Sequence, residues 1–385
     1  MKELRKRVPR TQLAQWRPAP DRRDPVELLN DAERGRIPAL LVLRHERMRE
    51  NPFAFYRGGA ALMAADLAPV PATGLRVQLG GDAHLMNFGG YASPERNLVF
   101  DVNDFDETLP GSFEWDVARL CASAPLLAEY RNFGKRAGED AAIAAARGYR
   151  THMRELAQLS PMEIWYSHVD VRGELAHELT APADAAHVKA PSDREAVVRK
   201  AFAAYRATLQ PHVRVLLDRY RPIDVYEHPV GVGSLGLDAA IIRLEAREGE
   251  MLYLQAKEAV ASALEPYLGA SKFANHGHRV VDGQHLMQAA TDVFVGWSSY
   301  EGHDYYLRQL RDGKASLDIE GIDAEELVDF AARCGMVLAR AHARTGDPGA
   351  IAAYLGSGDA FDEGLAGFAR AYAALVRRDY EAFCA

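Results

Sequence analysis

The sequence has few cysteines: three among 385 residues, Cys121, Cys334 and Cys384, with no Cys-x-x-Cys pair. Separated thiols of this kind provide neither a disulfide framework nor a cysteine-based zinc site. The basic start, MKELRKRVPR, is not followed by the apolar run of a signal peptide. Together these absences predict a soluble protein with reduced thiols in the cytoplasm.

Long apolar runs and an excess of positive charge are also missing. No stretch approaches the roughly 18 apolar residues of a membrane-spanning helix, so we expect no membrane partner. The formal net charge is −8, whereas a general nucleic-acid binder needs a basic surface, so we expect no nucleic-acid partner. A nucleotide pocket remains compatible with this charge, because a few local cations and a metal ion can hold one triphosphate.

What is present indicates an α+β protein with more than one lobe. A chain of 385 residues is too long for one small core. Helical periodicity dominates residues 113–220 and the tail, whereas VYEHPVGVGSLGL, AAIIRLEA and MLYLQAKEA are typical of three consecutive strands. We predict an N-terminal arm and helix (1–50), a helical lobe (51–222), a β-rich lobe (223–315) and C-terminal helices packing on the helical lobe (316–385).

Acidic and amide side chains gather in two neighbouring segments, GDAHLMNFGG and DVNDFDET. Asp82 and Asn87 follow one predicted strand, and Asp101, Asp104 and Asp106 end the next. Such oxygen ligands suit Mg²⁺, and phosphoryl transfer uses a carboxylate to orient the acceptor hydroxyl beside metal-binding Asp and Asn residues. Each residue alone is typical of a turn or a helix cap; the set favours a metal site.

Two residues near this set have open interpretations. His84 could ligate a metal or brace the loop by hydrogen bonds, and bracing is the favoured role. Arg57, in FAFYRGG, could neutralise phosphate or substrate charge, or could pair with a carboxylate for structural reasons.

A glycine-rich turn lies between two of the predicted strands, with Gly231-x-Gly233-x-x-Gly236 in VGVGSLGL. The dinucleotide-binding form of this motif leads into a helix, whereas here the chain continues as a strand. Strand–glycine loop–strand is the arrangement of a kinase phosphate-covering loop, whose N–H groups approach phosphates because no Cβ intervenes. We therefore predict nucleotide contacts at Gly231, Gly233, Ser234 and Gly236.

Lys257 lies in an apolar strand, LQAKEA. A buried lysine is costly unless its charge is paired, which favours a residue that binds nucleotide phosphates and an acidic partner. Glu265 and Asp282 are both candidates for that partner. The alternative is an edge-strand lysine that points to water.

The acidic segments carry a resemblance. GDAHLMNFG resembles the catalytic loop of aminoglycoside-phosphotransferase-type kinases, in which Gly-Asp-x-His-x-x-Asn recurs, and NDFDETLPGSFEWDVARL is similar to their metal-binding strand. The resemblance implies that Asp82 is the catalytic carboxylate and that Asn87 and Asp104 bind metal. It also implies that Asp116 caps a helix and braces the catalytic loop. PFAFYRG and other stretches resemble an uncharacterised bacterial family of the domain-of-unknown-function kind.

Some assignments within this resemblance stay open. Asp101 is the rival of Asp104 as the main metal ligand, and Asp106 is either a second ligand or a structural residue. Kinases of this type usually have a His before the Gly-Asp, where this chain has Gly80.

The order of the motifs is unusual, because the glycine loop and lysine of ordinary kinases precede the catalytic loop, whereas here they follow it. The resemblance therefore implies a circularly permuted, bilobal protein-kinase-like fold. Tyr305–Leu310 would lead to the hinge between the lobes, with Arg308 and Leu310 facing adenine. Two helices, Tyr56–Leu67 and Phe330–Arg344, compete to precede the catalytic loop in space.

The predicted function is ATP- and Mg²⁺-dependent transfer of a phosphoryl group to a hydroxyl acceptor. A nucleotide-binding pseudokinase, a metal-dependent phosphohydrolase and a nucleotidyl transferase are the alternatives. We expect the acceptor pocket within residues 120–220. Neither the acceptor, small molecule or protein, nor the oligomeric state follows from the sequence.

Overall fold

The computed structural model describes residues 1–385 except 172–178, 181–187, 191, 228–232, 234 and 311–314. Helices predominate, and each strand pair in this described part is antiparallel. The predicted α+β class is thus confirmed. No helix of the described part combines the length and the apolar character needed to cross a bilayer.

The largest sheet has six strands in the order β11-β12-β10-β9-β8-β7. Its centre contains the three predicted consecutive strands, and β10 lies between β12 and β9, away from either edge. The strands are β7 (Val188–Lys189), β8 (Tyr220–Glu227), β9 (Ala239–Ala246), β10 (Met251–Ala259), β11 (Gly296–Tyr300) and β12 (His303–Gln309).

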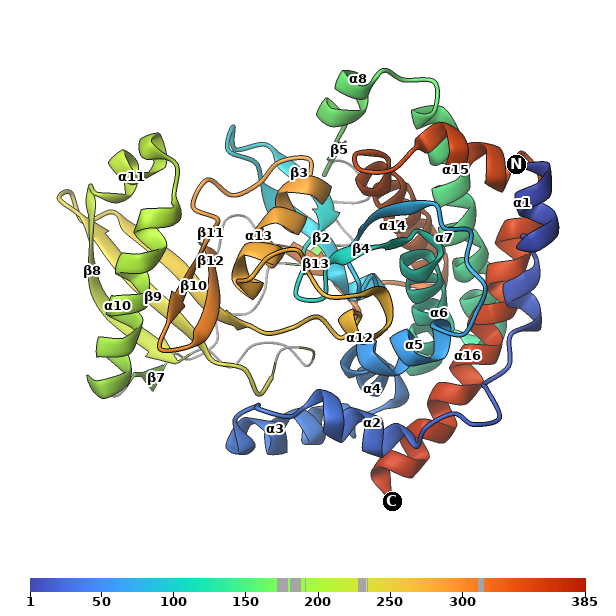
Figure 1. Ribbon diagram of the computed structural model, residues 1–385, viewed down its shortest axis with the longest axis horizontal. Coiled ribbons are helices and arrows are strands. Elements are labelled where there is room, and N and C mark those ends of the chain that lie inside the picture. Colours follow the sequence, from blue (N-terminus) through green and yellow to red (C-terminus); the bar gives the residue numbers. More distant parts are fainter. Residues whose placement is uncertain (172–178, 181–187, 191, 228–232, 234, 311–314) are drawn as a thin grey trace.

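Two helices, α10 (Ser192–Thr208) and α11 (Pro211–Leu217), lie beside this sheet in Figure 1. Tyr205 of α10 is fully buried among apolar side chains of the sheet, and its hydroxyl donates to the Phe294 carbonyl at 2.5 Å. Residues 192–217 therefore pack on the sheet and not on the helical lobe to which we assigned them. Helical periodicity shows which face of a helix is apolar, but not which neighbour covers it.

The helical part is built around α6 (Glu114–Tyr130), α7 (Gly134–Leu156), α14 (Ala324–Ala343) and α16 (Ala360–Cys384), with α15 (Pro348–Leu355) beside α7. Small residues let α7 and α14 approach closely: a Cβ on Gly148 would lie 2.3 Å from the Ala332 carbonyl oxygen. The C-terminal helices pack on α6 and α7, as expected for residues 316–385.

The N-terminal segment runs along the C-terminal helices before it reaches the sheet (Figure 1). Trp16 packs edge-on against Phe368, and Arg22 bridges Asp66 and Asp379. Its elements are α1 (Lys2–Arg7), η1 (Gln12–Gln15), α2 (Pro25–Ala32), α3 (Pro38–Met48), α4 (Pro52–Gly58) and α5 (Ala60–Leu67).

Two smaller sheets hold the acidic segments between the helices and the large sheet. The first pairs β1 (Arg76–Leu79) with β4 (Leu109–Ser112). The second has the order β5-β3-β2-β13-β6 and comprises β2 (Phe88–Ala92), β3 (Leu98–Val102), β5 (Val169–Asp170), β6 (Leu179–Thr180) and β13 (Ala315–Leu317). The other helices are η2 (Leu85–Asn87), α8 (Pro161–Tyr166), α12 (Glu265–Leu268) and α13 (His276–Met287).

Candidate functional site

The loop after β1 is held by hydrogen bonds to Asp116, in the first turn of α6. The Asp116 carboxylate accepts hydrogen bonds from the Gly80 N–H at 2.7 Å and the Gly81 N–H at 2.9 Å. His342 of α14 contacts the same carboxylate at 3.1 Å. A histidine from far along the chain thus lies beside this loop, which carries Gly80 where the resemblance leads us to expect a histidine. His342 belongs to α14, one of the two helices considered to precede this loop in space.

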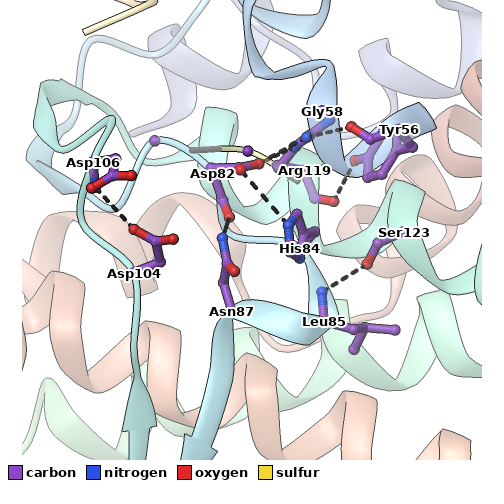
Figure 2. A network of polar contacts seen from close by, with 12 residues as sticks. Tyr56, Gly58, Asp82, His84, Leu85, Asn87, Asp104, Asp106, Arg119 and Ser123 are labelled. Atoms are coloured by element: carbon purple, nitrogen blue, oxygen red, sulfur yellow. Dashed lines mark hydrogen bonds and ion pairs between the residues drawn. The ribbon is translucent and has the colours of Figure 1, made fainter. Parts of the chain in front are cut away.

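Asp82 follows directly and is held by an arginine that sequence reasoning missed. The Arg119 Nε donates to Asp82 Oδ1 at 2.8 Å, and the same guanidinium donates to the Tyr56 carbonyl at 2.7 Å. Arg119 lies three residues after Asp116 and therefore on the same face of α6, a spacing that could have revealed it. The Asp82 side chain keeps 15% exposure and lines a cavity; Figure 2 shows it among Arg119, His84 and Asn87.

His84 is buried behind Asp82, with its Nε2 3.7 Å from Asp82 Oδ2. Burial lowers the pKa of His84 to about 3, although Asp82 opposes this shift. The imidazole is therefore neutral at neutral pH and contributes shape and polarity near Asp82 without a charge.

Asn87 and Asp104 offer oxygen atoms to a cation. The Asn87 amide donates through Nδ2 to the Asp82 carbonyl at 2.7 Å, which leaves its Oδ1 without a partner in the described part of the chain. Asp104 Oδ1 accepts the Asp106 N–H at 3.2 Å, and burial, reinforced by the Asp106 charge, raises the pKa of Asp104. A buried carboxylate of this kind gains from a nearby cation.

The described residues contain no group of three or more His, Cys, Asp or Glu side chains arranged to hold a metal by themselves. Mg²⁺ is commonly bound by one or two carboxylates together with substrate phosphates and water. Asp104 and Asn87 fit that use: they would hold Mg²⁺ as part of a metal–phosphate complex.

Asp101 does not belong to this site. Its carboxylate is fully buried, contacts Arg340 Nη2 at 2.7 Å through each oxygen, and accepts the Ala289 N–H at 2.8 Å. The assignment of Asp101 as a rival metal ligand is therefore corrected, because its charge is already compensated inside the protein core.

Lys257 of β10 reaches the acidic cluster from the large sheet. Its ammonium forms an ion pair with Asp106, 151 residues earlier in the sequence, and the Tyr306 hydroxyl donates to the other Asp106 oxygen at 2.9 Å. Burial alone would lower the pKa of Lys257, but Asp106, Tyr306 and Asp104 raise it above the ordinary value. Lys257 therefore stays charged.

Both acidic partners considered for Lys257 were wrong. Glu265 lies 3.9 Å from Arg279, and Asp282 lies 3.7 Å from Lys272. The edge-strand alternative also fails, since β10 is an inner strand and Lys257 is 2% exposed.

The described part of the glycine loop lies next to Asp82. A Cβ built on Gly233 would be 3.9 Å from Asp82 Oδ2 and 3.9 Å from the Arg57 carbonyl oxygen. The Gly233 carbonyl accepts from Arg44 at 2.9 Å, and Gly236, at φ +101°, accepts the Ile37 N–H at 2.7 Å. Helix α3 and the residues before it thus fasten this loop. Gly231 and Ser234 lie outside the described residues.

Arg308 lies close enough to Asp104 and Asp106 to interact with their charges, and Leu310 follows it at the end of β12. Arg308 donates to the Asn103 carbonyl and to Gln255, each at 3.0 Å, and the Leu310 N–H donates to the Tyr253 carbonyl at 2.8 Å. The Leu310 N–H is therefore engaged within the sheet, and the residues that follow, 311–314, are outside the described part. Contact of Arg308 and Leu310 with adenine stays a prediction.

Asp82, Asp104, Asp106 and Gly233 line one cavity of about 390 Å³. Its other walls come from α2, the junction of α4 and α5, and residues 260–267, and include Leu28, Leu29, Arg36, Arg44, Arg57, Ala60, Ala61, Ser262, Pro266 and Tyr267. None of the described residues within 120–220, where we expected the acceptor pocket, lines this cavity. The N-terminal segment, interpreted from sequence as a surface arm, instead forms part of this wall.

Comparison with known proteins identifies the family of this chain. Residues 36–189 and 174–385 match the bacterial family DUF2252, described as an uncharacterised protein conserved in bacteria. Because these matches cover most of the sequence, the chain belongs to that family. No curated protein and no solved structure matches the chain.

Proposed function

We propose that this protein is an ATP- and Mg²⁺-dependent phosphotransferase with a circularly permuted, kinase-like arrangement of its parts. The observation that carries the proposal is the convergence of two sequence-distant clusters on one cavity. Gly233, from the loop between β8 and β9, lines this cavity with Asp82 and Asp106 and approaches Asp82. Lys257, from β10, is linked to the cavity through its ion pair with Asp106. Acidic side chains, a glycine loop and a buried lysine are the parts that phosphoryl transfer uses.

Asp82 is the residue positioned to orient an acceptor hydroxyl. Arg119 holds Oδ1, so Oδ2, the oxygen nearer Gly233, is the atom left to accept a hydrogen bond from that hydroxyl. The neutral His84 behind it adds no competing charge. A fixed carboxylate contributes by holding the acceptor in line with the transferred group.

Asn87 Oδ1 and the Asp104 carboxylate would hold Mg²⁺, which with ATP supplies a phosphoryl group whose charge the metal partly neutralises. Lys257 neutralises Asp106 and keeps a positive charge beside Asp104. The Gly233 backbone lies where no Cβ separates it from the cavity, so an approaching phosphate meets main-chain atoms directly.

The alternatives differ in what they require. A metal-dependent phosphohydrolase based on the acidic cluster alone predicts no role for Lys257. The ion pair of Lys257 with Asp106 disfavours this alternative. A nucleotide-binding pseudokinase is supported by one observation, the engagement of Asp82 by Arg119, because a carboxylate neutralised in this way can serve a structural purpose alone.

A pair of variants tests the proposal with water as the acceptor. We expect the wild-type chain to be stabilised by Mg·ATP and to form ADP slowly. Asp104→Asn should lower Mg²⁺-dependent ADP formation at least a hundredfold. Glu363→Gln makes the same charge change at an exposed position of α16 and should leave ADP formation unchanged. Mg²⁺-dependent ATP binding without any ADP formation would support the pseudokinase instead, and an Asp104→Asn protein as active as wild type would refute the metal assignment.

A further inference from the structure

We infer that Arg57 and the N-terminus of α5 form an oxyanion-binding site in the wall of the cavity, beside Asp82. Arg57 ends α4 together with Gly58 and lines the cavity. Its Nε is buried and has no hydrogen-bond partner. Its guanidinium carbon lies 6.0 Å from the centroid of the Phe53 ring, and the charges of Asp82 and Glu50 act on it without a hydrogen bond or ion pair among the described residues.

Neighbouring arginines in the described part of the chain are occupied. Arg44 donates to Glu33 at 2.7 Å and to the Gly58 carbonyl at 2.8 Å. Arg36 donates to the Leu235 carbonyl at 2.6 Å, and Arg119 holds Asp82. Arg57 differs, because its charge has no hydrogen-bonded or ion-paired partner among the described residues. A guanidinium whose Nε is buried without a hydrogen-bond partner is costly, so an anion in the cavity is the expected partner.

The start of α5 adds a second positive feature. This eight-residue helix, Ala60–Leu67, has Gly59 as its N-cap and therefore no capping side chain. The first hydrogen bond to the cap runs from the Met63 N–H to the Gly59 carbonyl at 3.3 Å. Within the described part of the chain the N–H groups of Ala60, Ala61 and Leu62 have no backbone partner, as is usual at a helix start. Ala60 and Ala61 line the same cavity as Arg57. Unpaired N–H groups and the helix dipole both favour an anion at this place.

An arginine and a helix N-terminus that face one cavity can together bind a phosphate, sulfate or carboxylate group. The inference rests on the proposed function for the origin of this group. Next to Asp82, the oxyanion is either the terminal phosphate of the nucleotide or an anionic group on the acceptor. With either source, Arg57 takes part in substrate binding. The alternative interpretation, in which Arg57 pairs with a carboxylate of the chain for structural reasons, gives it no such role.

Titration calorimetry on the full chain tests this with three probes: inorganic phosphate, Mg·ADP and the Mg²⁺ complex of an ATP analogue with an imido group between its β- and γ-phosphates. We expect Arg57→Gln to weaken phosphate binding at least tenfold. Arg47→Gln is the matched control, since Arg47 lies close enough to influence Arg57 but does not line the cavity. It should change the affinity less than twofold.

The probes distinguish the two sources. If Arg57 holds the terminal phosphate, Arg57→Gln weakens the ATP analogue at least tenfold and Mg·ADP hardly at all. If Arg57 holds an anionic group of the acceptor, Arg57→Gln binds both nucleotides with wild-type affinity. Its affinity for inorganic phosphate, measured in the presence of a saturating concentration of the ATP analogue, is then reduced. The inference is overturned if Arg57→Gln leaves the affinities for phosphate and the analogue unchanged. Arg57-dependent phosphate binding in a protein that binds neither nucleotide would keep the oxyanion site and refute the proposed function.

Discussion

The ion pair of Lys257 and Asp106 connects β10 to the loop after β3. The side chains are 3% and 20% exposed, and the Tyr306 hydroxyl satisfies the second Asp106 oxygen. Two charges withdrawn from water are compatible with a stable fold only when each compensates the other. Removal of one partner therefore leaves a largely buried charge with weaker compensation.

We predict that Lys257→Met lowers the free energy of unfolding by about 3 kcal/mol, at the lower end for a broken buried pair, because Asp106 keeps its bond to Tyr306. The double variant Lys257→Met/Asp106→Asn should recover part of this loss, since the isolated charge is gone. Urea denaturation of both variants measures the difference. A double variant less stable than Lys257→Met would contradict this description of the pair.

His84 predicts a dependence of stability on pH. Burial lowers its pKa from the ordinary 6.5 to about 3, so between these values the unfolded chain binds a proton that the folded chain does not. The free energy of unfolding therefore falls as the pH decreases from 6.5 towards 3, by up to about 1.4 kcal/mol per pH unit from this residue.

The His84→Gln variant isolates that contribution, because glutamine does not titrate. We predict that its free energy of unfolding, measured by urea denaturation at several pH values, decreases less steeply below pH 6.5 than that of wild type. Parallel curves for the two proteins would show that His84 is protonated equally in the folded and unfolded states.

At the scale of elements, the turn between β1 and η2 depends on Gly81. Its φ is +83°, and a Cβ there would lie 2.4 Å from the Glu107 carbonyl oxygen. Gly74 has a similar φ of +75° with no atom within 4 Å of its Cβ position. Gly81 therefore combines conformational and steric restrictions, whereas Gly74 has only the first.

We predict that Gly74→Ala costs about 1 kcal/mol, the cost of a left-handed conformation for a residue with a Cβ. Gly81→Ala should cost at least about 3 kcal/mol, because the clash with backbone adds to that strain. Thermal unfolding of both variants compares them. Equal losses would mean that the loop after β1 can move away from Glu107, and that Asp82 is less rigidly held than its contacts indicate.

Elements with a strong local signal could be predicted from the sequence. The apolar segments AAIIRLEA and MLYLQAKEA were predicted as consecutive strands and form β9 and β10. The short strand β4, Leu109–Ser112, was missed because it contains a proline and a glycine and is stabilised by its pairing with β1. Likewise, α10 reads as a helix, but its position on the large sheet depends on contacts such as Tyr205 with Phe294.

For the molecule as a whole, segments that are far apart in the sequence come together around the cavity and the glycine loop. The segment before α4 fastens the glycine loop through Arg36 and Arg44 and also packs on α16 through Trp16. Residues of the N-terminal segment, such as Arg36 and Arg44, thus help to enclose a cavity whose other walls come from the middle of the sequence. A permuted kinase-like arrangement is physically accessible for this reason, since lobes fold as units and termini lie at the surface.

Part of the candidate site followed from the sequence and part could not. The spacing within GDAHLMNFGG placed Asp82 and Asn87 correctly in one loop, because neighbours in sequence are neighbours in space. Arg340 compensates Asp101 from 239 residues away, and no local pattern predicts such a pair. The sequence alone therefore could not separate Asp101 from Asp104, although both lie close to the end of β3.

The central claim is that Lys257, Gly233 and the residues Asp104 and Asn87 serve one metal–triphosphate. A crystal structure of the chain with Mg²⁺ and the imido analogue of ATP tests it most directly. We predict triphosphate density between Gly233 and the Lys257–Asp106 pair, with Mg²⁺ bound to Asp104 and Asn87. A nucleotide bound elsewhere, or a metal at the acidic residues with no phosphate near Gly233, would contradict the account.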